Sequence, residues 1–196
     1  MPEKLQTLLD EIRGCQLCVN DMKRPPRPVV QAAETARILI VGQAPGNLVF
    51  ESGRPFTDPS GDRLRAWLGI DETAFYDPRQ VAIVPMGFCF PGYDDKGGDL
   101  PPMRRCAETW RERLLKHLTK IQLTVVIGSY AQRWHLGDRR EKTLTATVAK
   151  WRDFLSDGLI VTPHPSWRNT GWLKRNPWFE TDVLPVLRTH VQAALS

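Results

Sequence analysis

The chain lacks any apolar stretch long enough to cross a membrane. Its aliphatic runs, such as Ile38 to Val41, are only a few residues long, whereas a transmembrane helix needs about 20 apolar residues. The first residues, Met1-Pro2-Glu3-Lys4, are polar and lead into an amphipathic stretch instead of the apolar core of a secretory signal. We therefore expect a protein without membrane spans that stays in the cytoplasm.

Cysteine is scarce, with four residues in 196, and neither repeats nor low-complexity tracts are present. A domain of this size buries about 70% of the surface of its unfolded chain, so it needs no disulfide framework. Hydrophobic residues make up 41% and charged residues 25% of the sequence, which excludes disordered and fibrous classes. We expect one compact domain over residues 1–196 and a monomer.

The excess of positive charge is small. The chain has 27 Lys and Arg against 22 Asp and Glu, a formal net charge of +5. A surplus of this sign favours encounters with polyanions such as nucleic acids. Because many basic proteins bind no DNA, the charge alone does not assign a partner.

Short β-branched runs alternate with helical patterns along the chain. Four such runs end at glycine or proline and are typical of buried strands: Ile38 to Val41, Val81 to Val84, Leu123 to Ile127 and Leu159 to Val161. Helical spacing is present in residues 3–13, Asp62 to Leu68, Met103 to Leu118 and Leu144 to Leu155. This alternation predicts an α/β fold with a parallel sheet that is covered on both faces.

Ligands of such sheets bind at the carboxyl ends of the strands. We therefore expect the segments that follow the four runs to share one rim: Gly42 to Gly46, Pro85 to Cys89, Gly128 to Ala131 and Thr162 to Ser166. Glycine and proline also stop strands for purely structural reasons. We interpret Gly128 as such a stop, and the first and last segments as parts of a site.

The four cysteines are Cys15 and Cys18, which form a CxxC pair, and the distant Cys89 and Cys106. In the cytoplasm disulfides are rare, so a metal centre, a redox pair and unrelated buried thiols remain as alternatives. Zinc sites usually combine two close CxxC pairs. The wide spacing here fits an iron–sulfur cluster better than a zinc ribbon.

Three further segments carry residues suited to chemistry on nucleic acids. His164 lies between two prolines after a predicted strand, so the backbone is stiff and holds the imidazole in a fixed place. Trp167 to Trp178 interleave aromatic and cationic side chains, a pattern that suits bases and phosphates, although Trp172 and Trp178 also fit the core. In Gly53 to Asp62, either Asp58 or Asp62 suits a helix N-cap, and Phe56 suits the core or a flat heterocycle.

Taken together, four motifs resemble those of the uracil-DNA glycosylase superfamily, and most closely its iron–sulfur families four and five. They are Gly42-Gln43-Ala44-Pro45-Gly46, the GRPF segment at residues 53–56, the four cysteines, and His164-Pro165-Ser166. The resemblance spans nearly the whole chain. It implies a three-layer α/β/α sandwich around a four-stranded, mainly parallel sheet. It also implies that the cysteines hold a [4Fe-4S] cluster, with zinc as the alternative.

Members of this superfamily flip a damaged nucleotide out of DNA and hydrolyse the bond between base and deoxyribose. The resemblance assigns His164 as the donor to the departing base and Phe56 as the ring that stacks on it. Arg168 and its neighbours correspond to the loop that enters the duplex. The implied activity is excision of uracil or another deaminated base, in base excision repair.

The sequence departs from the family pattern at two positions. Gln43 replaces the glutamate of family four, and Pro85 stands where that family places an asparagine that reads uracil. Family five also lacks the glutamate and uses an aspartate in a stretch similar to Phe56-Thr57-Asp58-Pro59-Ser60. The resemblance therefore favours Asp58 as the catalytic carboxylate and leaves the identity of the excised base open.

These arguments give a defined set of candidate residues. The predicted catalytic group is Asp58, His164 and Gln43; the substrate-binding group is Gly42, Ala44, Pro45, Gly46, Phe56 and Ser166; the DNA-binding group is Trp167, Arg168, Asn169, Lys174 and Arg175; and the cluster ligands are Cys15, Cys18, Cys89 and Cys106. The alternatives are a nucleic-acid-binding member without catalytic activity, and covalent capture of the sugar. Tyr93 to Lys96 remain unexplained.

Overall fold

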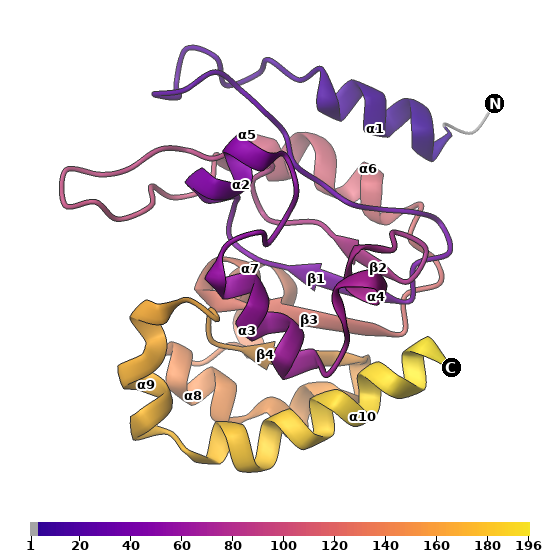
Figure 1. Ribbon diagram of the computed structural model, residues 1–196, viewed down its shortest axis with the longest axis vertical. Helices are drawn as coiled ribbons and strands as arrows, with labels where there is room; N and C mark the ends of the chain where they lie inside the picture. Colours follow the sequence, from indigo (N-terminus) through magenta and orange to yellow (C-terminus); the bar gives the residue numbers. More distant parts are fainter. Residues whose placement is uncertain (1–3) are drawn as a thin grey trace.

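A four-stranded sheet forms the centre of the protein, whose computed structural model describes residues 4–196 (Figure 1). The strands are β1 (Ile38–Val41), β2 (Val81–Ile83), β3 (Leu123–Ile127) and β4 (Leu159–Thr162). Their order is β2-β1-β3-β4, and all neighbours are parallel. The predicted α/β fold with a parallel sheet is confirmed. The predicted end of β2, Val84, is one residue too late, and the predicted end of β4, Val161, is one residue too early.

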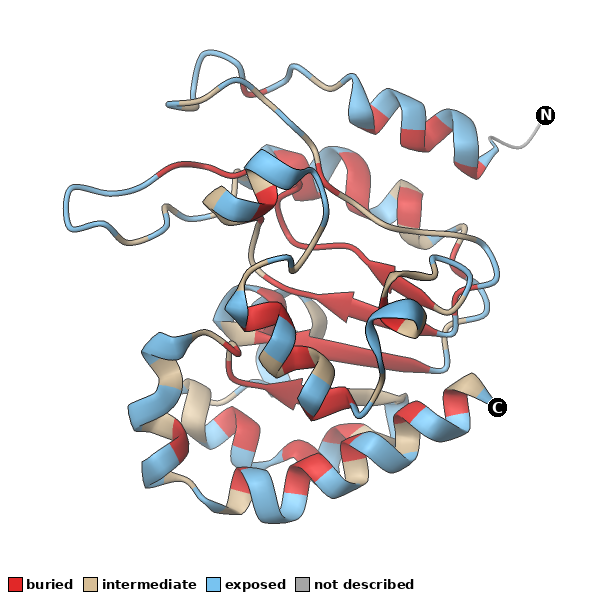
Figure 2. Cartoon of the chain, in the orientation of Figure 1, coloured by how far each residue is buried: buried red, intermediate tan, exposed pale blue. Residues whose placement is uncertain are grey.

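The strands are hydrophobic because the sheet is covered on both faces, and Figure 2 shows them buried along most of their length. Helices α3 (Pro59–Leu68) and α10 (Leu184–Leu195) pack against one face, and the Trp67 ring of α3 lies 4.9 Å from that of Phe179, in the π turn that precedes α10. Helix α7 (Gly128–Leu136) covers the other face (Figure 1). The arrangement is the three-layer sandwich that the resemblance implies.

Helix α3 begins three residues before the predicted Asp62. Asp58 is the N-cap, Pro59 occupies the first turn, and the Asp58 carboxylate accepts a hydrogen bond from the backbone N–H of Ser60. A proline at the start of a helix is favourable because its missing N–H has no helical partner there. Asp62, the other candidate cap, pairs with Arg65 within the helix.

The predicted helix Met103 to Leu118 is divided into three parts. These are α5 (Arg104–Cys106), the π-helical η1 (Ala107–Arg111) and α6 (Glu112–Leu115). A π turn inserts an extra residue and rotates the side chains that follow. The predicted helix Leu144 to Leu155 is likewise divided into α8 (Leu144–Ala149) and the 3-10 helix η3 (Trp151–Asp157).

The N-terminal helix α1 (Leu5–Arg13) buries its apolar face, as its spacing predicts. An ion pair of 2.8 Å joins Glu11 of this helix to Arg113 of α6. The remaining helices are α2 (Asn47–Ser52), α4 (Glu72–Tyr76), η2 (Gly137–Arg139), η4 (Trp167–Asn169), α9 (Thr170–Arg175) and η5 (Phe179–Val183). Within residues 4–196, no helix has the length and apolar character needed to span a membrane.

Candidate active site

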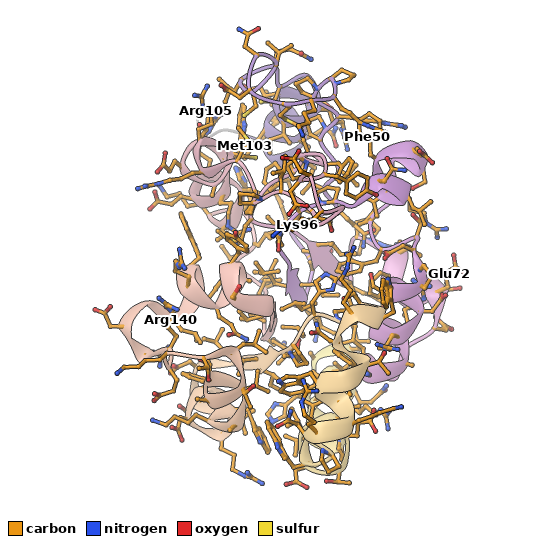
Figure 3. All side chains as sticks on the ribbon, turned by 90° about the vertical axis from the view of Figure 1, so that its left-hand side faces the viewer. Phe50, Glu72, Lys96, Met103, Arg105 and Arg140 are labelled. Atoms are coloured by element: carbon orange, nitrogen blue, oxygen red, sulfur yellow. The ribbon has the colours of Figure 1, made fainter. Side chains whose placement is uncertain are left out.

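A cleft of about 780 Å³ lies at the carboxyl edge of the sheet, the edge that Figure 3 faces. Its walls come from segments that are far apart in the sequence. Among the predicted site residues, the lining includes Gly42, Gln43, Ala44, Pro45, Gly46, Phe56, Asp58, His164, Ser166, Trp167 and Arg168. The structure therefore brings the predicted catalytic and substrate-binding residues together in one cleft.

The segment that follows β1 forms the floor of the cleft. The backbone carbonyls of Gly42 and Gln43 accept hydrogen bonds of 2.9 Å from Met86 and Gly87, which follow β2. A Cβ at Gly42 would lie 3.8 Å from the ring of Phe56. The Phe56 ring therefore packs beside the backbone of Gly42 in the cleft.

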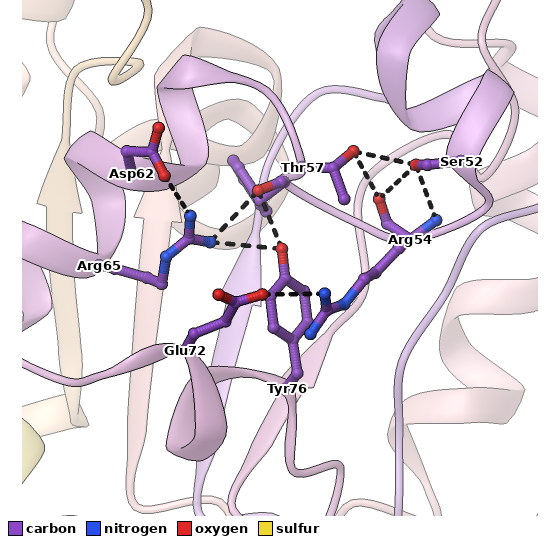
Figure 4. Close-up of polar contacts among 8 residues, drawn as sticks. Ser52, Arg54, Thr57, Asp62, Arg65, Glu72 and Tyr76 are labelled. Carbon is purple, nitrogen blue, oxygen red and sulfur yellow. Dashed lines mark hydrogen bonds and ion pairs between the residues drawn. The ribbon is translucent and has the colours of Figure 1, made fainter.

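Phe56 is held in an unusual backbone conformation, with φ at 53°. This left-handed region costs a bulky residue energy, and such strain collects at functional sites. The Phe56 carbonyl accepts hydrogen bonds from the Tyr76 hydroxyl at 3.0 Å and from Arg65 at 3.3 Å, which Figure 4 draws. It also packs so closely against Gly61 that a Cβ there would lie 1.8 Å from its oxygen. The surrounding structure thus fixes the ring over the cleft.

Asp58 follows this strained residue and lines the same cleft. Its Oδ2 accepts a 2.6 Å hydrogen bond from the Ser60 hydroxyl and a 3.3 Å bond from the Ser60 N–H. One carboxylate oxygen is therefore occupied by the N-terminus of α3. Asp58 therefore caps α3, as one of the two sequence interpretations predicted, and it also lines the cleft.

His164 has a defined tautomer. Its Nδ1 accepts a 3.1 Å hydrogen bond from the backbone N–H of Ser166, so the neutral ring carries its proton on Nε2. Burial lowers the pKa of His164, and the negative charges of Asp58 and Asp99 oppose that shift. The imidazole is therefore a neutral donor at pH 7. Asn169 donates a 2.8 Å bond to the His164 carbonyl, which fixes the loop further.

The sequence analysis missed Asp99. This residue lines the main cleft and an adjoining hollow, whose walls include Gly128 and Asn169. Burial raises the pKa of Asp99, and the nearby charges of Arg168 and His164 oppose the shift. The only sequence signal was the unexplained polar segment around Tyr93 to Lys96. Gly128 directly follows β3 and has a φ of 75°, which agrees with its interpretation as a strand stop.

The predicted DNA-binding residues fall into two groups. Trp167 is 72% exposed beside the cleft, and the guanidinium of Arg168 lies 5.4 Å from its ring centre. Lys174 and Arg175 are exposed on α9 and do not line the cleft. Trp172 and Trp178 pack against the core, which was the structural interpretation of both.

Arg111 is a fully buried cation behind the cleft wall. Its guanidinium donates hydrogen bonds to the carbonyls of Val84 at 2.6 Å and Pro85 at 2.8 Å, where the chain leaves β2. Its third contact is His135 Nε2 at 3.1 Å. Because arginine only donates, His135 must be neutral and accept at Nε2. This cation holds Pro85 in the wall of the cleft.

We predict that acid weakens the fold through His135. Burial, with a smaller effect of Arg111, lowers the pKa of His135 to about 4, against about 6.5 in an unfolded chain. The unfolded state therefore binds more protons below pH 6.5, and lowering the pH from 7 to 5 should cost about 2 kcal/mol. His135→Gln should reduce this loss in urea unfolding, whereas His190→Gln should keep it. An equal pH dependence in all three proteins would contradict the prediction.

The comparison with protein families gives one result that matches this geometry. The model of the uracil DNA glycosylase superfamily matches residues 29–188. The chain belongs to this superfamily. The match includes the whole sheet and every segment that lines the cleft. Membership in the uracil DNA glycosylase superfamily points to a glycosylase-type activity on DNA, but not to a particular base.

Cys15 and Cys18 lie outside the segment that matches the superfamily, yet all four cysteines line one cavity. All four are free thiols, and Cys106 Sγ accepts a 3.3 Å hydrogen bond from the Phe88 N–H. Burial raises the pKa of Cys89 to about 12 and that of Cys106 to about 11. The structure thus gathers the four predicted cluster ligands from the N-terminal segment and from the middle of the chain.

The chemistry of this cavity fits an iron–sulfur cluster. Among residues 4–196, no three His, Cys, Asp or Glu side chains are placed to hold a single metal ion. A [4Fe-4S] cluster does not require such convergence, because its four thiolates bind different irons. Trp110 also lines the cavity, and its buried Nε1 has no hydrogen-bond partner among residues 4–196. Four cysteine thiols around one cavity are a donor set that suits either an iron–sulfur cluster or zinc.

Proposed function

We propose that this protein hydrolyses the N-glycosidic bond of uracil, or of another deaminated base, in DNA. The observation that carries the proposal is the meeting of Phe56, Asp58 and His164 in one cleft at the carboxyl edge of the sheet. An aromatic ring, a carboxylate and a neutral imidazole are the groups that this reaction needs. Superfamily membership supports the same reaction class.

The charge that develops during the reaction explains each group. The departing base becomes an anion while the sugar becomes a cation, so the site needs a donor beside the base and a carboxylate beside the sugar. His164 Nε2–H serves as the donor because Nδ1 is already bonded to Ser166. Asp58 supplies negative charge near the sugar, and Phe56 stacks on the flipped base.

Gln43 differs from the other two proposed catalytic residues because its amide is already bonded. Its Nε2 donates a 3.2 Å hydrogen bond to the Leu100 carbonyl. We propose that it holds the floor of the cleft in place. Pro85 lines the cleft without a side-chain amide, so base selection would depend on backbone groups and on the shape of the cleft.

The function is tested by incubating the full chain with oligonucleotides that carry uracil, hypoxanthine or xanthine, in single and double strands. Release of a base leaves an abasic site, which alkali converts into a strand break. We expect breaks at uracil or at one of the other two bases, with none in the undamaged oligonucleotide. The absence of breaks at all three bases would overturn the proposal.

Two other outcomes would point to the alternative functions. Binding to damaged DNA in a gel shift, with no abasic product after long incubation, would indicate a nucleic-acid-binding protein that has lost hydrolysis. Gln43 and Pro85, which depart from the family pattern, motivate this alternative. A protein–DNA adduct that survives SDS would indicate covalent capture of the sugar.

We also propose that the cysteine-lined cavity holds a [4Fe-4S] cluster on Cys15, Cys18, Cys89 and Cys106. Such a cluster supplies a rigid cross-link between the N-terminal segment and the rest of the fold, and it is capable of electron transfer. Buried thiolates need nearby positive charge, which iron ions provide. Arg105 joins the same two parts of the chain, since it donates to the Leu17 carbonyl at 3.0 Å.

We predict that each single Cys→Ser variant at these four positions loses most of its iron. The reason is that the four thiolates each bind one iron, so no ligand is redundant. Iron and acid-labile sulfide per chain, together with visible absorbance, measure the loss. Purified wild-type protein with one zinc and no sulfide would contradict the prediction, and so would variants that keep the full iron content.

A further inference from the structure

The loop that joins Cys89 to Cys106 projects from the carboxyl edge of the sheet (Figure 1). Figure 3 shows Lys96, near its tip, close to the middle of that face. Its backbone folds back on itself through a bridge between Tyr93 and Asp99 and a 2.9 Å hydrogen bond from the Leu100 N–H to the Gly92 carbonyl. The loop is therefore a structured element over the cleft.

Asp94 organises the turn of this loop. Its carboxylate accepts hydrogen bonds from the backbone N–H groups of Lys96 at 2.9 Å and Gly98 at 2.7 Å. The Asp94 N–H in turn donates to the Gly98 carbonyl at 2.8 Å. These bonds use Asp94 for structure and leave Asp99 as the carboxylate of the loop that lines the cleft.

Two bonds attach the loop to segments that line the cleft, one on each side of Asp99. Gln43 donates to the Leu100 carbonyl at 3.2 Å, and Arg168 Nη2 donates to the Gly97 carbonyl at 3.1 Å. Gln43 belongs to the segment after β1, and Arg168 to the segment after β4. The backbone on both sides of Asp99 is thus fixed relative to the catalytic groups.

The carboxylates of Asp58 and Asp99 differ in their hydrogen bonds. Asp58 is bonded to Ser60 twice and caps α3. The Asp99 carboxylate makes no hydrogen bond or ion pair with any group in residues 4–196, and it is open to solvent in the cleft. It lies near enough to His164, Arg168 and Asp58 to interact with their charges. Of the two, Asp99 is the carboxylate with free oxygens for a substrate or a water.

We propose that Asp99 is a second catalytic carboxylate, which accepts the proton of the attacking water, while Asp58 supplies negative charge near the sugar and holds the Phe56 segment and α3 in position. This inference rests on the proposed glycosylase function. The water oxygen forms a bond to the sugar C1′, and the C1′–N bond breaks with its electron pair passing to the base. One water proton passes to Asp99. The base anion is stabilised by His164 and takes a proton from solvent.

The protein surroundings suit Asp99 to this task. Partial burial raises its pKa, which makes it a better proton acceptor than an aspartate in free solution. The positive charge of Arg168 opposes this rise in the pKa of Asp99. Because Asp99 is open to solvent, a water molecule can reach its carboxylate. Bound DNA would close the cleft over Asp99.

The test compares Asp99→Asn, Asp99→Glu and Asp58→Asn in single-turnover excision from a single-stranded oligonucleotide containing uracil, or the base identified above. Asp95→Asn is the matched control, because it makes the same change on the same loop at a side chain that does not line the cleft. We expect Asp99→Asn to lower the rate on the order of 10²-fold or more, and Asp95→Asn to leave it unchanged.

The pH profile separates a proton acceptor from a structural residue. The acid limb of the rate should disappear in Asp99→Asn, return in Asp99→Glu and persist in Asp58→Asn at a lower overall rate. An active wild type whose Asp99→Asn variant keeps its rate and acid limb would overturn the role of Asp99 and leave the glycosylase function standing. A wild type that releases no base would overturn both.

Discussion

Replacing His164 by alanine should lower the rate of base excision by about 10²–10³-fold, the usual loss for one donor aimed at developing negative charge. The neutral ring has a single donor, Nε2–H, because Nδ1 accepts from Ser166. That donor acts mainly on the anion formed as the bond breaks. Affinity for intact DNA should therefore change much less than the single-turnover rate.

The matched control for this prediction is His190→Ala, which removes an imidazole from α10 outside the cleft. Its excision rate should equal that of the wild type. His164→Gln offers a second comparison, since its amide N–H replaces the donor in part. If His164→Ala excises within threefold of the wild type while remaining folded, another group must stabilise the departing base.

Gly61→Ala should destabilise the fold by about 3 kcal/mol and remove most of the excision activity. A Cβ at this position would lie 1.8 Å from the Phe56 carbonyl oxygen and 2.7 Å from its carbon, and overpacking against backbone costs about 1–3 kcal/mol or more. The chain can relieve the clash only by moving Phe56 and Asp58. Urea unfolding gives the loss of stability, and excision at a temperature where the variant is folded gives the loss of activity.

The same substitution at Gly171 provides the control. Gly171 lies in α9, and a Cβ there would meet only the side chain of Arg175 at 3.5 Å. Alanine is favoured over glycine in helices by up to about 1 kcal/mol, so Gly171→Ala should be neutral or stabilising. Equal effects of the two substitutions would show that helix propensity, and not contact with Phe56, decides the outcome.

Much of this fold was predictable because its signals are local. Each strand is a short β-branched run that ends at glycine or proline, and both properties are visible without tertiary information. The convergence of Gln43 and His164 followed from one rule, that parallel strands present their carboxyl ends at one edge; Phe56, which lies between α2 and α3, was assigned to the site by the family resemblance. Family motifs then assigned roles to these residues.

The remaining features depend on contacts that no local pattern encodes. Asp99 is one acidic residue among several in a polar loop, and only the bonds from Gln43 and Arg168 place it in the cleft. Arg111 interrupts an apolar helical pattern, so its burial could not be inferred from hydropathy. The π turn that precedes α6 likewise depends on tertiary packing.

The loop that bears Asp99 has both ends at one place, because Cys89 and Cys106 line the same cavity. Because the two ends of this loop lie together, adding or removing residues at its tip changes the sheet little. Each doubling of loop length costs only about 0.6 kcal/mol of closure free energy. Changes of length at this tip would act on the turn that Asp94 organises and on the bond from Arg168 to Gly97, while the sheet and the cysteine-lined cavity stay in place.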